Sequence, residues 1–134
     1  MDAIAICRQA QEEMFGNARL ELVDELTTPD IVNHGARAGH AHGREAVKGQ
    51  IRGIHSGFDD LSYDIEDAFQ SGDKVVIRCT ARGTNTGEWM GHQPTGKSFA
   101  VEHIHIYRLE SDRIAEHWAA RDDLGLMRQL GHAS

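Results

Sequence analysis

The segment VEHIHIYRLESDRIAEHWAARDD, residues 101–123, decides the fold of this chain. Polar and apolar side chains alternate along it on both sides of Ser111-Asp112, which is the pattern of two antiparallel strands joined by a short turn. A two-residue turn at these positions pairs Glu110 with Arg113. The segment therefore predicts the last hairpin of an antiparallel sheet.

The pairing of this hairpin sorts its side chains into two faces, with His105 opposite Trp118 and His103 opposite Ala120. The face that contains these residues comprises Val101, His103, His105, Tyr107, Ile114, Glu116, Trp118, Ala120 and, if the strand continues, Asp122. The opposite face comprises Glu102, Ile104, Ile106, Arg108, Ala115, His117 and Arg121. The first face mixes aromatic and apolar groups with two histidines and a carboxylate, as the wall of a ligand pocket does. A turn of odd length would shift the register by one residue and break this grouping.

The rest of the chain divides by its hydrophobic period, because spacing of about 3.6 residues predicts helices and alternation predicts strands. The expected elements, in order, are helices at residues 4–15 and 20–26, a helix that begins after Gly43, strands that begin at Leu61, Val75, Phe99 and Arg113, and a helix at residues 122–130. Residues 30–34 fit an extended segment or a single turn. Three helices, a four-stranded meander and a closing helix predict an α+β fold.

Length, charge and cysteine content restrict the class of protein. A chain of 134 residues fits one domain, residues 1–134. The net charge of −7 and the scattered basic residues argue against a nucleic-acid or membrane partner. Cys7 and Cys79 are too few for a disulfide-stapled secreted scaffold, and the first residues lack the pattern of a signal peptide. We therefore expect a cytoplasmic protein with free thiols.

Three motifs carry a family resemblance. The loop GTNTGEWMGHQPTGK, residues 83–97, resembles the G-T-x-x-G…G…P-T-G-K loop of SnoaL-like polyketide cyclases and their ester-cyclase relatives. The ending IAEHWAARDDLGLMRQLG, residues 114–131, is similar to that family's I-x-E-x-W-x-x-x-D-x-L-G-L-x-x-Q-L-G. DIVNH, residues 30–34, with Gly43 after it, matches the early D-x-V-x-H…G. The resemblance covers nearly the whole chain in the right order.

The resemblance implies a fold and a chemistry. The fold is the cone shared with nuclear transport factor 2 and ketosteroid isomerase, in which a curved antiparallel sheet packs on N-terminal helices and encloses a cavity. The family also implies a homo-oligomer, which we expect to be a dimer. Its cyclases perform an intramolecular aldol condensation without a metal or an organic cofactor. By the resemblance, Asp122 is the acid/base and a strand histidine, matched here to His105, assists it.

We therefore predict a cofactor-free lyase or isomerase that cyclises or isomerises a small, apolar, carbonyl-containing compound of polyketide type. The predicted catalytic residues are Asp122 and His105. The predicted substrate-binding residues are Asn33, His34, Asn85, His103, Tyr107 and Trp118. Asn85 stands where many relatives have a histidine, which indicates an altered substrate.

Several alternatives stay open at this level. Either Asp122 or Asp123 can be the N-cap of the closing helix, because aspartate favours that position. His103 and His105 can be two metal ligands, with His34 or Glu116 as a third. The protein can also be a small-molecule binding protein without chemistry, an enzyme like the epoxide hydrolases with Glu116 as a second carboxylate, or a dimeric accessory module.

Overall fold

The computed structural model describes residues 2–37 and 41–133. Its helices are α1 (Ala3–Gln9), which continues as a π-helical turn (Ala10–Phe15), α2 (Glu21–Leu26), α3 (Arg44–Gly57) and α4 (Asp123–Leu130). Its strands are β1 (Thr27–Asn33), β2 (Ala41–His42), β3 (Ser62–Ser71), β4 (Lys74–Thr84), β5 (Ser98–Glu110) and β6 (Arg113–Arg121). Within the described ranges, no helix is long and apolar enough to cross a membrane.

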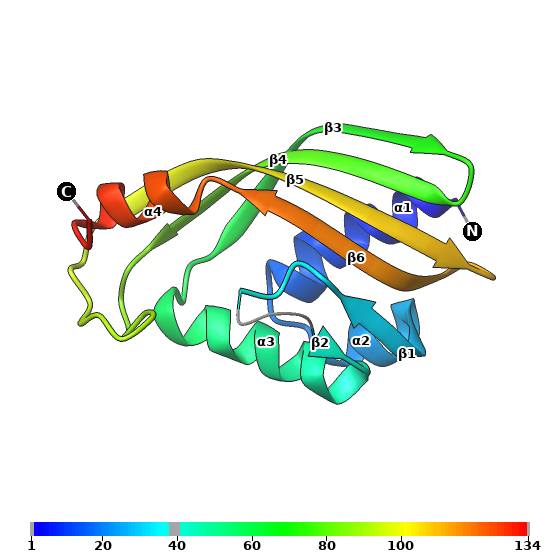
Figure 1. Ribbon diagram of the computed structural model, residues 1–134, viewed down its shortest axis with the longest axis horizontal. Coiled ribbons are helices and arrows are strands. Elements are labelled where there is room, and N and C mark those ends of the chain that lie inside the picture. Colours follow the sequence, from blue (N-terminus) through cyan, green and yellow to red (C-terminus); the bar gives the residue numbers. More distant parts are fainter. Residues whose placement is uncertain (1, 38–40, 134) are drawn as a thin grey trace.

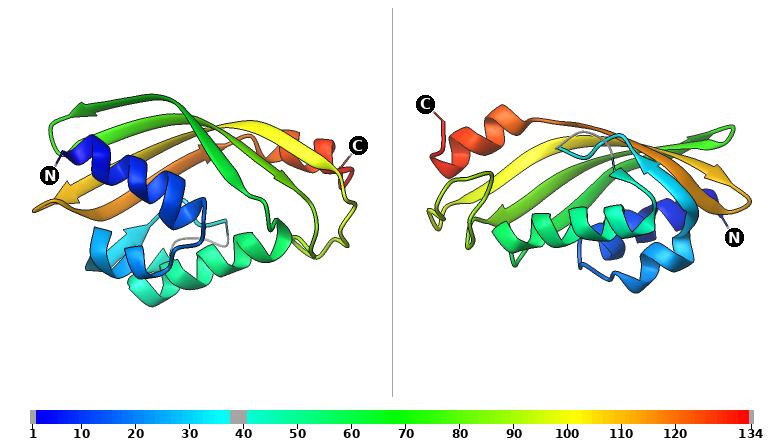
Figure 2. Two further views of the ribbon diagram at one scale, coloured as in Figure 1. Left: turned by 180° about the vertical axis from the view of Figure 1, so that it is seen from behind. Right: turned by 60° about the horizontal axis from the view of Figure 1, so that its bottom comes forward.

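The strands form one curved sheet in the order β2-β1-β6-β5-β4-β3 (Figure 1). Strands β3 to β6 pair antiparallel in chain order, which confirms the predicted meander. β1 pairs with β6 in parallel, so most of the segment at residues 30–34 is a strand. Helices α1, α2 and α3 lie beneath the arched sheet (Figures 1 and 2). Helix α4 follows the C-terminal end of β6 and lies beside the start of β5. The expected α+β cone is confirmed.

The helix ends follow local sequence rules. Asp2 caps α1 by accepting a hydrogen bond from the Ile4 amide at 3.1 Å, as N-cap aspartates do. Helix α3 begins directly after Gly43, whose φ of +90° is accessible to glycine. Helix α4 ends at Gly131, with φ of +83°, as predicted.

The core consists of two apolar clusters along the sheet. Alternate residues of β4, namely Val75, Ile77, Cys79 and Ala81, are all fully buried, as their spacing predicted. The first cluster joins helices α1, α2 and α3 to the half of the sheet next to the β3–β4 and β5–β6 turns. The second cluster gathers around Phe58, Phe99 and Leu126. On β5, Val101 belongs to the second cluster and Tyr107 to the first. His103 and His105 therefore occupy the stretch of buried surface between the two clusters.

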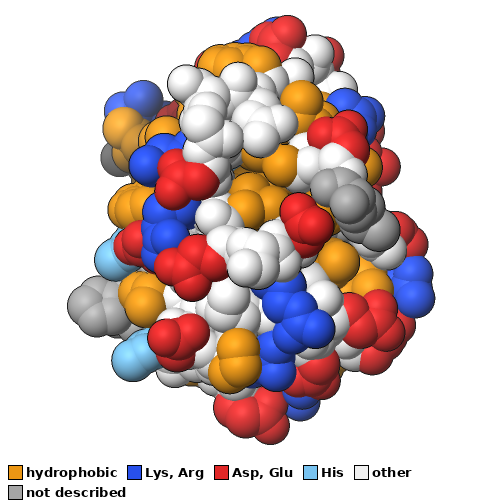
Figure 3. Space-filling model, turned by 90° about the vertical axis from the view of Figure 1, so that its right-hand side faces the viewer, with side chains coloured by type: hydrophobic (Ala, Val, Ile, Leu, Met, Phe, Trp, Pro, Cys, Tyr) orange, Lys and Arg blue, Asp and Glu red, His pale blue; other side chains and the backbone are white. Residues whose placement is uncertain are grey.

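The outer surface carries both signs of charge. Figure 3 shows acidic and basic side chains interspersed over the end of the molecule at which the β3–β4 and β5–β6 turns lie. Strands β3 and β4 also carry exposed ion pairs, such as Arg78 with Asp67 at 2.7 Å and Arg82 with Asp64 at 2.7 Å. Exposed pairs of this kind stabilise a fold by about 0–1 kcal/mol each.

Candidate functional site

A β-bulge in β6 decides which side chains of the last hairpin face the interior. Next to the turn the pairing is as predicted, with Glu110 opposite Arg113. The register then shifts, because Leu109 pairs with Ile114 whereas Arg108 pairs with Glu116. Residue 115 is thus the extra residue of the bulge, and every later side chain of β6 is moved to the other face.

The shift overturns the predicted grouping of His105 with Trp118. His105 stands opposite Ala119. The inward position next to Tyr107 belongs to His117, which is 1% exposed and which the sequence placed on the outer face. Trp118 instead stacks on exposed His34, with ring centroids 5.2 Å apart. Trp118 and His34 therefore do not line the interior, contrary to their predicted substrate-binding role.

Glu116 also lies on the outer face. Its carboxylate binds the ring of His34 at 2.8 Å and the guanidinium of Arg108 at 2.7 Å. Hydrogen bonds from these two partners lower the pKa of the Glu116 carboxyl. Glu116 therefore cannot serve as the second carboxylate of an epoxide hydrolase-like site inside the cone.

Three buried histidines form a continuous hydrogen-bonded chain. His103 Nδ1 lies 3.2 Å from His105 Nε2, and His105 Nδ1 lies 2.8 Å from His117 Nε2. His117 Nδ1 is buried and has no partner among the described residues. A neutral imidazole has one donor and one acceptor nitrogen, so all the hydrogen bonds of this chain must run in the same direction. A proton taken up at one end can shift the tautomer of every ring.

Burial keeps all three imidazoles neutral. It lowers the pKa of His103 and of His117 from 6.5 to about 3, with positively charged Arg121 acting in the same direction. Burial also lowers the pKa of His105 well below its ordinary value, reinforced by the two neighbouring histidines. Near neutral pH, each ring therefore has one acceptor nitrogen. When the hydrogen bonds run from His103 to His117, the acceptors of His105 and His117 are used within the chain, and Nε2 of His103 is left as an acceptor.

The structure holds an outer groove and an inner cavity that share a neck. The groove has a volume of about 500 Å³ and runs along α3, past Ala46, Gln50 and Met90. The cavity, which Tyr63 and His103 line, has about 10 Å³, room for roughly one water molecule. Arg37, Ile54 and Trp89 border both spaces and form the neck. The groove is in the size range of small-molecule pockets.

Two tyrosines on the inner face differ in their freedom to meet a ligand. Tyr107 donates its hydroxyl to Gln11 Oε1 at 2.6 Å and is fully buried, so it fixes the sheet to the helical layer and does not border the cavity. Tyr63 borders the cavity, and its ring centroid lies 5.8 Å from that of His103. Burial raises the pKa of Tyr63 to about 12, so its hydroxyl remains a donor. The alternation of residues 61–67 could have identified Tyr63 beforehand.

Asp122 does not face the cavity. Its carboxylate is exposed and accepts a hydrogen bond from the Gly125 amide at 2.8 Å, as the N-cap of α4. The predicted inward position of Asp122 is therefore wrong, and the capping alternative is correct. The cause is the bulge, which turns Arg121 inward and so turns Asp122 outward. Asp123 reaches instead towards the neck, where it binds Arg37 at 2.9 Å.

Asn33 and Asn85 are buried and both stabilise the backbone around the groove. Asn33 accepts a hydrogen bond from the Gly35 amide at 2.8 Å and donates to Gln50 of the groove wall at 2.7 Å. Asn85 donates to the Gly87 carbonyl at 2.8 Å and accepts from the Thr95 amide at 3.1 Å. Asn85 thus ties the long loop together and does not border the groove or the cavity.

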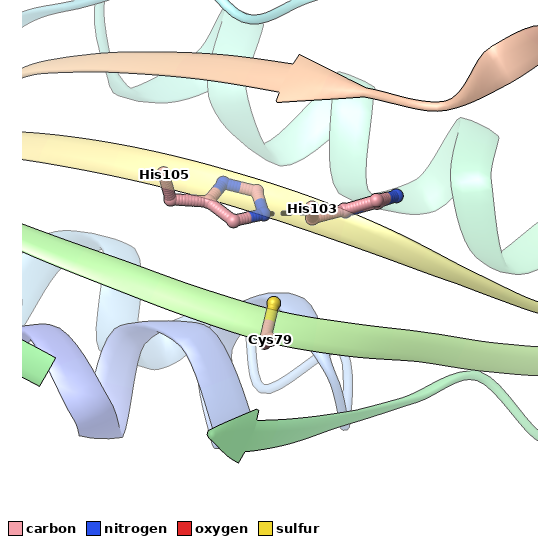
Figure 4. Close-up of side chains that lie close together, drawn as sticks. All are labelled: Cys79, His103 and His105. Atoms are coloured by element: carbon pink, nitrogen blue, oxygen red, sulfur yellow. Dashed lines mark hydrogen bonds between the residues drawn. The ribbon is translucent and has the colours of Figure 1, made fainter. Parts of the chain in front are cut away.

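One group of side chains has the composition of a metal site. The ligand atoms of Cys79, His103 and His105 lie within 4.8 Å of one another (Figure 4). A bound metal needs a thiolate and free ring nitrogens. Burial raises the pKa of the Cys79 thiol to about 12, and the rings are engaged with each other. These donors fit a hydrogen-bonded chain better than a metal site, and the suggested third ligands, His34 and Glu116, lie on the other face.

Sequence comparison relates the chain to enzymes of known activity. A sequence model of the SnoaL-like polyketide cyclases matches residues 5–130. The nogalonic acid methyl ester cyclase of Streptomyces nogalater is 28% identical over 122 residues, which cover 87% of this chain and 89% of that protein. The aklanonic acid methyl ester cyclase DauD of Streptomyces sp. (strain C5) is 26% identical over 122 residues, 89% of this chain and 76% of that protein.

Solved structures agree with this relation. The crystal structure of wild-type IdmH from Streptomyces antibioticus has a TM-score of 0.85 at 34% identity and covers 98% of this chain and 99% of its own. A protein from Jannaschia sp. CCS1 has a TM-score of 0.90 at 19% identity over 98% and 93% of the two chains, a likeness of fold alone. Because the family's sequence model spans residues 5–130, nearly the whole chain, this chain belongs to the SnoaL-like polyketide cyclase family.

Proposed function

We propose that this chain catalyses an intramolecular aldol-type cyclisation of a small, carbonyl-containing, polyketide-like compound, with His103 as the acid–base group. The observation that carries the proposal is the position of His103, which is a wall residue of the inner cavity and the first member of the histidine chain. The polyketide cyclases among the relatives support the reaction class.

The described walls of the inner cavity contain no carboxylate, so the base must be of another type. Neutral His103 can accept the proton next to a substrate carbonyl. The imidazolium that results is unfavourable in an empty, buried site, but an adjacent enolate supplies the opposite charge that favours it. The Tyr63 hydroxyl, which remains protonated, can donate to the enolate and later to the alkoxide. Such acid–base assistance contributes about 10²–10⁴-fold to a rate.

His105 is a positioning residue in this proposal and does not touch the substrate. Its Nε2 fixes the ring of His103, and its Nδ1 connects that ring to His117. The predicted assisting role of His105 thus becomes an indirect one. Because the cavity has room for about one water molecule, the neck must widen for the reacting part of the substrate to reach His103.

Turnover of the methyl esters of nogalonic acid and aklanonic acid, the compounds that the relatives' names specify, is the first test. Ring closure by aldol addition leaves the mass unchanged, so the product is followed by chromatography and NMR. We expect His103→Gln to lower kcat by about 100-fold or more, and Asp122→Asn, the matched control outside the cavity, to retain it. Full turnover by His103→Gln would refute the acid–base role.

A second candidate is a binding protein with the same pocket, which the exposed N-cap position of Asp122 favours. It predicts tight binding of these esters without any product. We further propose that the chain forms a homodimer, which sedimentation or light scattering would test. The exposed Phe69 and Ile104 give such a dimer an apolar contact.

A further inference from the structure

Two arginines lie at or beside the neck between the groove and the inner cavity. Arg37 borders both spaces, and Arg121 stands opposite His103 in the β5–β6 pairing. The electrostatic effect of both arginines reaches His103 and Tyr63. Asp123 is the carboxylate that pairs with Arg37. The groove lining also contains Glu88, for which the described residues show no ion pair with either arginine.

The pair of Arg37 with Asp123 is asymmetric. The side chain of Arg37 is 19% exposed, whereas that of Asp123 is 50% exposed. The guanidinium also lies over the ring of Trp89, with its central carbon 5.1 Å from the ring centroid. A partner that is half in water contributes little binding free energy to such a pair. A carboxylate that enters from the groove can therefore replace Asp123 on a guanidinium that is already held in place.

Arg121 is a mostly buried cation that makes no direct ion pair with the described residues. Its guanidinium donates to the carbonyl of Gly35, and no carboxylate of the described residues lies within ion-pair distance. Burial lowers the pKa of the Arg121 guanidinium, and neighbouring Arg37 lowers it further. Burying a cation without an anion is unfavourable, so a negatively charged ligand near it would be stabilised.

Trp89 provides an independent sign of a ligand at the same place. Its side chain is 7% exposed and borders both the groove and the cavity. Its indole N–H is buried and has no hydrogen-bond partner among the described residues. A buried donor without an acceptor costs about 1–3 kcal/mol, which an acceptor oxygen of a ligand would recover.

We propose that the neck is a carboxylate-binding site in which the Arg37 guanidinium and the Trp89 indole N–H hold the carboxylate of an aromatic, polyketide-type acid. The proposal rests on the proposed function and names the substrate class of the same pocket. It distinguishes this chain from the two relatives named above, which are methyl ester cyclases. Here the free acid is the preferred ligand, because an ester offers no negative charge to the arginines.

The test compares two ligands that differ only in this charge, anthraquinone-2-carboxylate and its methyl ester, by titration calorimetry. We expect the acid to bind at least about tenfold more tightly, the effect of a charge-assisted hydrogen bond in a partly buried site. Arg37→Met should abolish the preference, and Arg52→Met, an exposed arginine of α3 outside the groove lining, should keep it. Asp123→Asn should strengthen binding of the acid and leave the ester unchanged.

Each contrary result is decisive. Equal binding of acid and ester, no binding of either, or an acid preference that survives Arg37→Met would overturn the proposal. Circular dichroism of each variant confirms that it is folded. Turnover is measured separately from binding. If His103→Gln loses cyclisation but keeps the preference for the acid, the carboxylate site stands. If turnover is normal and the acid is not preferred, the carboxylate site alone is overturned.

Discussion

Lowering the pH from 7 to 5 tests the histidine chain through the stability of the protein. His103 and His117 have a pKa of about 3 in the native state against 6.5 for an ordinary histidine. Between these values the unfolded chain binds protons that the native state excludes. Stability is therefore fully present above about pH 6.5 and falls progressively as the pH drops towards 3.

The magnitude follows from these two values. At pH 5, each of the two histidines favours the unfolded state by about 2 kcal/mol relative to pH 7, or about 4 kcal/mol together. The lowered pKa of His105 adds in the same direction. A loss of this size is a large part of the 5–15 kcal/mol that stabilises a typical domain. Urea unfolding at intervals of half a pH unit measures it directly.

Two variants assign the effect to the chain. His117→Phe keeps an aromatic ring beside Tyr107 and Phe15, with which the imidazole is in contact, but removes one titrating group. We expect it to reduce the pH slope of the free energy of unfolding by up to about 1.4 kcal/mol per pH unit. Tyr107→Phe is the matched control, since a tyrosine does not titrate in this range. A flat stability profile between pH 7 and 5, or an unchanged slope in His117→Phe, would refute the buried neutral chain.

Four substitutions test local contacts, each by urea unfolding. Tyr107→Phe should lower the free energy of unfolding by about 2 kcal/mol, because it leaves buried Gln11 without its partner. Ligand affinity should not change, and a large loss of affinity would show that Tyr107 meets the ligand. Asp122→Ala should cost about 1 kcal/mol through loss of the α4 cap, and no change would contradict that role. Gly87→Ala should cost about 1–3 kcal/mol, because a Cβ would meet the backbone carbonyl of Ser56. Gly49→Ala on α3 has open space around it and should stabilise slightly, so equal effects at both glycines would contradict the steric argument.

Periodicity of the sequence determined the fold class and the meander. Fully buried alternate residues from Val75 to Ala81 and the helical spacing of Val47 and Ile51 left few alternatives, because each element buries one face against the same core. The end of α4 was likewise predictable, because Gly131 adopts the left-handed backbone conformation that glycine favours after a helix. These signals are local in the chain, and for that reason they could be recognised without coordinates.

The site depended on contacts that no local pattern shows. One extra residue in β6 exchanged the faces of His117 and Trp118, and a bulge depends on how the whole sheet curves. Asp122 illustrates the consequence, since the sequence offered both a pocket position and a cap, and the bulge decided for the cap. Arg37 drew no attention in the sequence, because it is a single arginine in a loop. Only the tertiary fold brought Arg37 next to Trp89 and Asp123, which follow it by more than fifty residues in the chain, and so placed its charge at the neck of the pocket.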